Sequence, residues 1–243
     1  LIMDQTAFMN VCREALGFVD THGALLTLGI QPTYPNTGYG YIQYDQQAIS
    51  SNTYKVKVFT EKPNLELAKT FIACGDFLWN AGIFIWKAKQ VVQAFEQYQP
   101  EMYELFAAEL PCYNTEEEQA ALERIYPLCT NISIDYAIME QANNVYVIPS
   151  SFGWSDLGTW NSAYDNLEKD YLGNAVAGDN VMVIDATKCM VSVPNHKLLV
   201  LQGLDDFIIV DTKDALLVCK KDKEQAIKEY VAEVKRNKGD QYL

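Results

Sequence analysis

The sequence predicts an α/β fold followed by a small β-rich unit with a terminal helix. Over residues 1–171, helical apolar patterns alternate with short apolar runs of the kind that form buried strands. After Asp170 the runs become short and closely spaced, and Asn, Asp, Gly and Pro turn residues separate them. A chain of 243 residues that is 49% hydrophobic can bury a sizeable core. We therefore expect two domains, residues 1–171 and residues 172–243.

The elements of the first part follow from apolar spacing and from capping residues. Apolar positions three and four apart predict a helix over residues 4–19, which Asp4 can cap and Gly23 can end. The almost wholly apolar run 24–30 predicts a buried strand, and alternation predicts another strand over 54–60. Helices are further expected at 65–74, 89–98, 101–109 and 133–139, and strands at 82–86 and 145–148.

The second part is expected to hold several short strands and one helix. The helix has a clear apolar side with i, i+3 and i+4 spacing. The expected strands are 181–184, 197–201, 207–210 and 215–218, and the expected helix is 223–236.

Composition excludes several classes of partner. The net charge of -13 repels nucleic acid and an anionic membrane surface alike, although one or two local Lys or Arg side chains can still hold a phosphorylated small molecule. The six cysteines have no C-x-x-C spacing, and the two histidines have no neighbouring ligand cluster, so no zinc or redox site is expected. No apolar run approaches the roughly 20 residues that span a bilayer, and we predict a cytoplasmic protein.

The first candidate site is the segment Thr37-Gly38-Tyr39-Gly40-Tyr41-Ile42. Gly40 would let a ligand approach the backbone closely, and the flanking Tyr rings could stack on a sugar or a base. The alternative is a turn that enters an edge strand. The segment is not a Walker loop, because no Gly-Lys-Thr or Gly-Lys-Ser follows.

Glu61-Lys62-Pro63 and Asn80 form the second and third candidates. Glu61 can accept hydrogen bonds from hydroxyls and Lys62 can pair with a phosphate, or the two can be a solvated corner at a strand end. Asn80 stands among apolar and small residues before an expected strand, where its carboxamide needs partners. Sugar hydroxyls are suitable partners, and capping of a turn is the alternative.

The fourth candidate is Asp156, within Gly153-Trp154-Ser155-Asp156-Leu157-Gly158. A carboxylate on a loop after a strand is a plausible ligand for Mg²⁺, which also keeps waters and phosphate oxygens. The alternative is a turn aspartate that accepts a hydrogen bond from the backbone.

Taken in order, these motifs resemble the mannose-1-phosphate guanylyltransferase family. The matching segments also include Thr27-Leu28-Gly29-Ile30 and Ser133-Ile134-Asp135-Tyr136-Ala137. The Ser-Ile-Asp-Tyr-Ala and Gly-Trp-Ser-Asp segments favour the mannose enzymes over related thymidylyl-, uridylyl- and adenylyltransferases. The resemblance runs over essentially the whole chain.

The resemblance implies a Rossmann-like nucleotidyltransferase fold with a mixed sheet, of which residues 1–171 are the sugar-phosphate-binding portion. It implies transfer of GMP from GTP to mannose 1-phosphate, giving GDP-mannose and pyrophosphate. Glu61 and Asn80 would bind mannose hydroxyls, and Gly40 would offer a backbone contact to the sugar. Lys62 would neutralise phosphate charge as a catalytic and substrate-binding residue. Asp156 would be catalytic as one of two metal-binding aspartates, with Mg²⁺ as cofactor.

The sequence departs from the family at its start. The glycine-rich loop that grips GTP is absent, and the family's other metal aspartate normally precedes a Leu-Ile pair like Leu1-Ile2. We therefore expect a truncated form that is inactive alone, with GTP held mainly by the missing part, and a sheet edge left open that favours self-association.

Two alternatives stay open. The chain could be a catalytically silent sugar-phosphate-binding or assembly module, with a homodimer formed through the C-terminal β unit. It could also belong to a sister hexose-1-phosphate nucleotidyltransferase with another base or sugar. A glycine-rich loop upstream would favour the guanylyltransferase over the silent module, and nucleotide competition would separate the sister enzymes.

Overall fold

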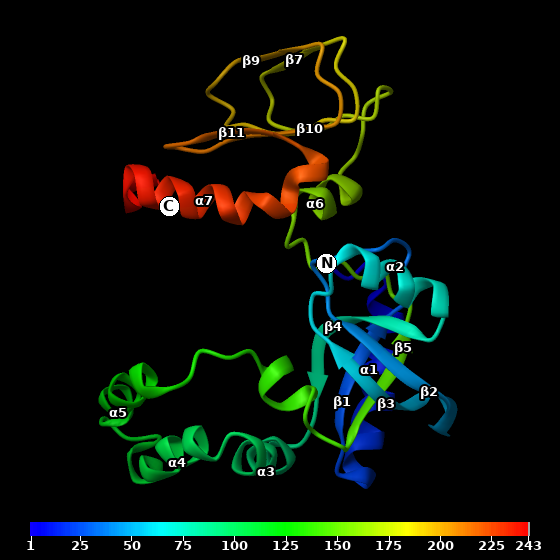
Figure 1. Ribbon diagram of the computed structural model, residues 1–243, viewed down its shortest axis with the longest axis vertical. Coiled ribbons are helices and arrows are strands. Elements are labelled where there is room, and N and C mark those ends of the chain that lie inside the picture. Colours follow the sequence, from blue (N-terminus) through cyan, green and yellow to red (C-terminus); the bar gives the residue numbers. More distant parts are fainter. Residues whose placement is uncertain (243) are drawn as a thin grey trace. The chain divides into compact units, whose positions relative to one another are not determined.

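The computed structural model describes residues 1–242 and contains two compact units (Figure 1). One unit comprises Ile2–Trp154, and the other comprises Leu1 together with the residues from Ser155 onward. The boundary expected between residues 171 and 172 lies within the second unit, and the assignment of domains stays a prediction.

The first unit is built on a five-stranded mixed sheet that closes on itself in the order β1-β4-β2-β3-β5. β1 pairs with β5 in parallel, and all the other pairings are antiparallel. The strands are β1 (Leu25–Ile30), β2 (Tyr41–Ser50), β3 (Thr53–Thr60), β4 (Phe77–Ile85) and β5 (Val145–Ser150). The expected open edge is wrong for this sheet within residues 1–242, because β3 also pairs with β5.

Side-chain caps set the starts of the first two helices of this unit. Asp4 caps α1 (Gln5–His22) by accepting from the Ala7 N–H at 2.8 Å, and Gly23 ends it in the left-handed conformation. Asn64 caps α2 (Leu65–Cys74) in the same way, by accepting from the Leu67 N–H. Between β4 and β5 the chain makes a helical excursion (Figure 1). The remaining elements are α3 (Ala88–Tyr98), α4 (Pro100–Ala108), η1 (Leu110–Cys112), α5 (Glu118–Ile125), η2 (Tyr126–Leu128) and the π-helical turn η3 (Asp135–Met139).

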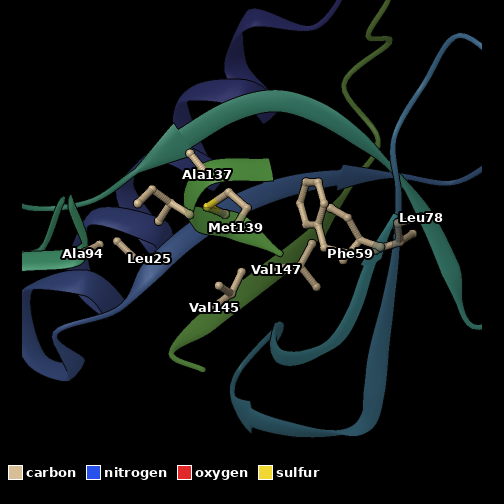
Figure 2. Packing of buried hydrophobic residues seen from close by; sticks show 10 residues of the cluster. Leu25, Phe59, Leu78, Ala94, Ala137, Met139, Val145 and Val147 are labelled. Carbon is tan, nitrogen blue, oxygen red and sulfur yellow. The ribbon is translucent and has the colours of Figure 1, made fainter. Parts of the chain in front are cut away.

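The main core lies on one face of the sheet. Side chains from β1, β3, β4 and β5 pack there against Ala94 of α3 and against Ala137 and Met139 of η3 (Figure 2). Gly29 in β1 leaves room for a close neighbour in the core, because a Cβ added there would stand 2.6 Å from Leu78 Cδ1. The turn η3 is thus anchored in the core, which fixes the polar residues that flank its buried face.

The second unit contains parallel strands that alternate between two sheets. β6 (Ala175–Ala177), β8 (Met190–Ser192) and β10 (Phe207–Asp211) pair in parallel, and β11 (Leu216–Lys220) pairs with β10 in the antiparallel direction. β7 (Val181–Ile184) and β9 (Leu199–Gln202) form the other parallel pair. Since the chain visits the two sheets in turn, it winds as the coils of a short β-helix.

Helices that precede and follow these strands in the sequence complete this unit. They are α6 (Trp160–Asn166), η4 (Lys221–Ala226) and α7 (Ile227–Lys238), followed by the turn η5 (Asp240–Tyr242). Asn161 ties α6 to η4, because its backbone N–H and its carboxamide both donate to Glu224, at 2.8 and 2.7 Å.

The α/β class and the β-rich C-terminal unit with its helix are confirmed. The main difference lies in β4, which begins at Phe77 rather than at residue 82, so that Asn80 is inside a strand and not before it. β2, β6, β8, α5 and α6 were not predicted, because each is short or carries a weak apolar pattern.

Candidate functional site

Four of the predicted site residues converge in the first unit. Gly40 precedes β2, Glu61 and Lys62 follow β3, and Asn80 lies in β4. The Asn80 N–H donates to the Gly40 carbonyl oxygen at 2.8 Å. A Cβ added to Gly40 would lie 2.5 Å from Glu61 Oε2 and 3.6 Å from Asn80 Nδ2. The two side chains therefore flank the same point above the Gly40 backbone.

Asn80 is only 9% exposed, and its carboxamide has three polar neighbours. Its Oδ1 accepts from the Thr27 hydroxyl and from the Gly82 N–H, both at 3.1 Å. Its Nδ2 donates to Asp135 Oδ1 at 2.9 Å. Gly82 has a φ of 66° inside β4, beside a register shift between β1 and β4, so the strand bends there and turns its N–H back toward Asn80.

Glu61 and Lys62 form an ion pair in which the carboxylate is sheltered and the ammonium is not. The Glu61 side chain is 7% exposed and the Lys62 side chain 51% exposed. The pKa of Lys62 is raised, first by its hydrogen bond to Glu61 and then, against partial burial, by the charges of Glu61 and Asp135. Lys62 also has a φ of 47°, which is uncommon for a residue other than glycine and more so before a proline. Strain of this kind often marks a functional position.

The turn η3 adds two carboxylates to this group. Asp135 contacts Asn80, and the pKa of Glu140 is raised, first by desolvation and also by the charges of Glu61 and Asp135, against a hydrogen bond from the Glu61 backbone. The Glu140 N–H bonds to the Asp135 carbonyl oxygen at 2.9 Å, so the turn closes over five residues. A π-type turn thus carries both acidic side chains to the same neighbourhood.

Asp156 lies in the second compact unit and is exposed. Its Oδ1 accepts from the Gly158 N–H at 3.0 Å, which is the turn geometry that the sequence offered as the alternative. Among residues 1–242, no three His, Cys, Asp or Glu side chains are grouped so that they could hold a metal ion. A single exposed carboxylate still fits Mg²⁺, because this ion uses one or two carboxylates together with waters and substrate phosphates.

The aromatic rings near Gly40 are core residues. Tyr39 and Tyr41 are buried, and the Tyr39 ring packs edge-on against Trp79 and Trp154, with centroids 5.1 and 5.3 Å apart. The Tyr41 hydroxyl donates to the Asn36 carbonyl oxygen at 2.9 Å. The burial of both rings in a cluster with Phe71, Phe77 and Trp79 favours the alternative of a turn that enters a strand over stacking on a ligand.

Sequence reasoning missed Thr27, Asp135 and Glu140 as members of the site. Asp135 and Thr27 belong to segments that carried the family resemblance, yet neither had been given a role. Glu140 carried no signal of its own, since only a turn that closes over five residues brings it beside Asp135.

The match to family models follows the division into an α/β part and a β-rich part. Residues 2–171 match the nucleotidyl transferase family, and the chain belongs to this family. Residues 179–234 match the family described as a MannoseP isomerase/GMP-like beta-helix domain.

The more particular likeness is to mannose-1-phosphate guanylyltransferases, which confirms the resemblance inferred from the motifs. The chain is 32% identical over 249 residues to the mannose-1-phosphate guanylyltransferase of Salmonella montevideo, covering 100% of this chain and 52% of that protein. It is 36% identical over 236 residues to the alginate biosynthesis protein AlgA of Pseudomonas syringae pv. tomato, covering 96% of this chain and 48% of that protein. The chain thus spans about half the length of the curated relatives it matches.

A solved structure confirms the fold. The crystal structure of a mannose-1-phosphate geranyltransferase from Thermus thermophilus matches with a TM-score of 0.81 at 26% identity, over 97% of this chain and 67% of that one. No helix among the described residues is long and apolar enough to cross a membrane.

Proposed function

We propose that this chain provides the sugar-phosphate site of an enzyme that transfers GMP from GTP to mannose 1-phosphate. The observation that carries the proposal is the convergence of Gly40, Glu61 and Asn80 around one point, with Lys62 beside it. Glu61 accepts hydrogen bonds from hydroxyls and the Asn80 Nδ2 donates to them, which suits a polyol. The Lys62 ammonium pairs with the phosphate.

In the proposed reaction, a phosphate oxygen of mannose 1-phosphate attacks the α-phosphorus of GTP. The bond from this phosphorus to the bridging oxygen of the β-phosphate breaks, and pyrophosphate leaves. The residues of this chain act by orienting the sugar and by offsetting charge, without a covalent intermediate. Asp156 would hold Mg²⁺, which would neutralise phosphate charge when bound.

The proposal is tested by isothermal titration of mannose 1-phosphate into this chain in the presence of Mg²⁺. Asn80→Ala should weaken binding by roughly 5- to 20-fold, because one donor to the sugar is lost and its polar neighbours are left without a partner. Asn10→Ala is the matched control, since Asn10 is exposed on α1 and its side chain accepts from Arg13 of the same helix, far from Gly40 in the sequence. It should bind like the parent chain.

Two outcomes would overturn the assignment. No detectable heat from a chain that circular dichroism shows to be folded would mean that these residues do not make a sugar-phosphate site. Equal affinity in Asn80→Ala and the parent chain would place the sugar elsewhere. Glucose 1-phosphate, titrated in parallel, tests the preference for mannose, and nucleotide competition tests the base.

A further inference from the structure

The neighbours of Asn80 determine which way its carboxamide faces. Its Oδ1 meets two donors, the Thr27 hydroxyl and the Gly82 N–H, and its Nδ2 meets the carboxylate of Asp135. In the reversed orientation the NH₂ group would face the Gly82 N–H and the oxygen would face the Asp135 carboxylate, so that both of these contacts would be lost, whereas the Thr27 hydroxyl can turn to accept as well as donate. The arrangement therefore selects one orientation of an almost buried amide.

This orientation has a consequence for the space above Gly40. Asn80 Nδ2 carries two protons, and Asp135 accepts only one of them. The position of a Cβ on Gly40 lies 3.6 Å from Nδ2 and 2.5 Å from Glu61 Oε2. A ligand hydroxyl near this position can accept from Nδ2 while it donates to Glu61. A reversed amide would offer it two acceptors and no donor.

We propose that Asp135 is a positioning residue, whose carboxylate holds the Asn80 carboxamide with its nitrogen toward a sugar hydroxyl. This inference rests on the proposed function, since it takes the ligand to be mannose 1-phosphate. Asp135 acts through Asn80, and Thr27 supports the amide from its opposite side.

The turn η3 is suited to this task because its apolar side chains are held in the core while its two ends carry acidic residues toward the site. Ala137, Ile138 and Met139 are buried in the core, while Asp135 and Glu140 reach the site from the two ends of the turn. The pKa of Glu140 is raised by desolvation and by the charges of Glu61 and Asp135, so Glu140 lies near Glu61, the other residue that flanks Gly40. One short turn thus holds the amide of Asn80 directly through Asp135.

The first test is a set of variants at Asp135 in the full chain. Asp135→Ala should weaken mannose 1-phosphate binding by about tenfold, whereas Asp135→Asn should keep most of the affinity, because its Oδ1 can still accept from Nδ2. In an Asn80→Ala background, Asp135→Ala should change binding by less than about twofold, since the pathway through Asn80 is already absent. Asp45→Asn is the matched control, because Asp45 lies on β2 and its half-exposed side chain pairs with Lys57 of the neighbouring strand.

The second test needs no ligand. The side-chain amide signals of Asn80, assigned by their loss in Asn80→Ala, should exchange with solvent at least about tenfold faster in Asp135→Ala than in the parent chain. Unchanged exchange, or additive losses of affinity in the double variant, would overturn the role of Asp135. If the parent chain bound no sugar phosphate, the proposed function would fail, while the exchange measurement would still decide whether Asp135 orients the amide.

Discussion

Gly40→Ala tests the geometry of the site most directly. The new methyl carbon would stand 2.5 Å from Glu61 Oε2, which is well inside the contact distance of a carbon and an oxygen, and 3.3 Å from Asn80 Cβ. Glu61 Oε2 is the far end of a side chain that can turn, whereas Asn80 is held in β4 by its backbone. We therefore expect the Glu61 carboxylate to move by roughly 1 Å and the barrel to stay folded.

The size of the effect follows from what the moved carboxylate can no longer do. A hydrogen bond to a charged group contributes about 1.5–3 kcal/mol, and each 1.4 kcal/mol is a factor of ten, so mannose 1-phosphate should bind about 10- to 100-fold more weakly. The free energy of unfolding should fall by no more than about 2.6 kcal/mol, because about 1–3 kcal/mol of overpacking is partly offset by about 0.4–1 kcal/mol from the less flexible unfolded chain.

Calorimetric titration and thermal unfolding measure the two quantities separately. Gly17→Ala is the matched control, since Gly17 lies in α1 and a Cβ there meets nothing within 4 Å. It should raise stability by about 0.5–1 kcal/mol and leave binding unchanged. If Gly40→Ala bound mannose 1-phosphate as tightly as the parent chain, the Glu61 carboxylate would not be held above Gly40, and the proposed geometry of the site would be refuted whatever the melting temperature.

Three further substitutions test other parts of the structure. Gly29→Ala should cost about 2–3 kcal/mol and lower the melting temperature by roughly 4–12 °C, because its Cβ would clash with Leu78 in the core. Burial raises the pKa of Asp170, but hydrogen bonds from Asn174 and nearby backbone amides outweigh it, so the pKa is lowered. The unfolded chain then binds the proton more tightly, and the stability from Asp170 is present above about pH 4 and is lost as the pH falls through the folded pKa. Asp170→Asn should therefore flatten acid unfolding measured by circular dichroism. Lys62→Gly should relieve the left-handed backbone but leave the sheltered Glu61 carboxylate without its ion pair, so the melting temperature should change little while phosphate binding weakens in the titration.

The fold was predictable where local signals agreed with tertiary demands. The buried strand around Leu28 and the helices expected at 65–74 and 89–98 were marked by apolar spacing, and they formed within one residue of the expected bounds. Closure of the sheet could not be predicted, because the pairing of β3 with β5 joins residues some 90 positions apart and leaves no local pattern. The short parallel strands β6 and β8 were missed for a related reason, since three residues carry no period.

For the site, the sequence indicated which residues belong to it but did not indicate how these residues are arranged in space. The motifs named Gly40, Glu61, Lys62 and Asn80, but the bend at Gly82 that turns the backbone toward Asn80 is a property of the folded strand. The roles of these residues and of Asp156 stay predictions until ligand binding is measured. The buried tyrosines show the limit of motif reasoning, because exposure cannot be read from a Gly-Tyr-Gly-Tyr segment.

The charges around Asn80 indicate which part of a sugar phosphate would lie there. Glu61, Asp135 and Glu140 bring acidic side chains to the neighbourhood of the Lys62 ammonium. Such a group repels a phosphate but accepts hydrogen bonds from hydroxyls, so we propose that the sugar ring would lie over Gly40 and the phosphate on the exposed side of Lys62. Because exposed charges are screened within about 10 Å at 0.1 M salt, the affinity for mannose 1-phosphate should fall as salt rises, while any affinity for mannose itself should not. Titrations of both ligands at two salt concentrations check this, and an equal salt dependence would place the phosphate away from Lys62.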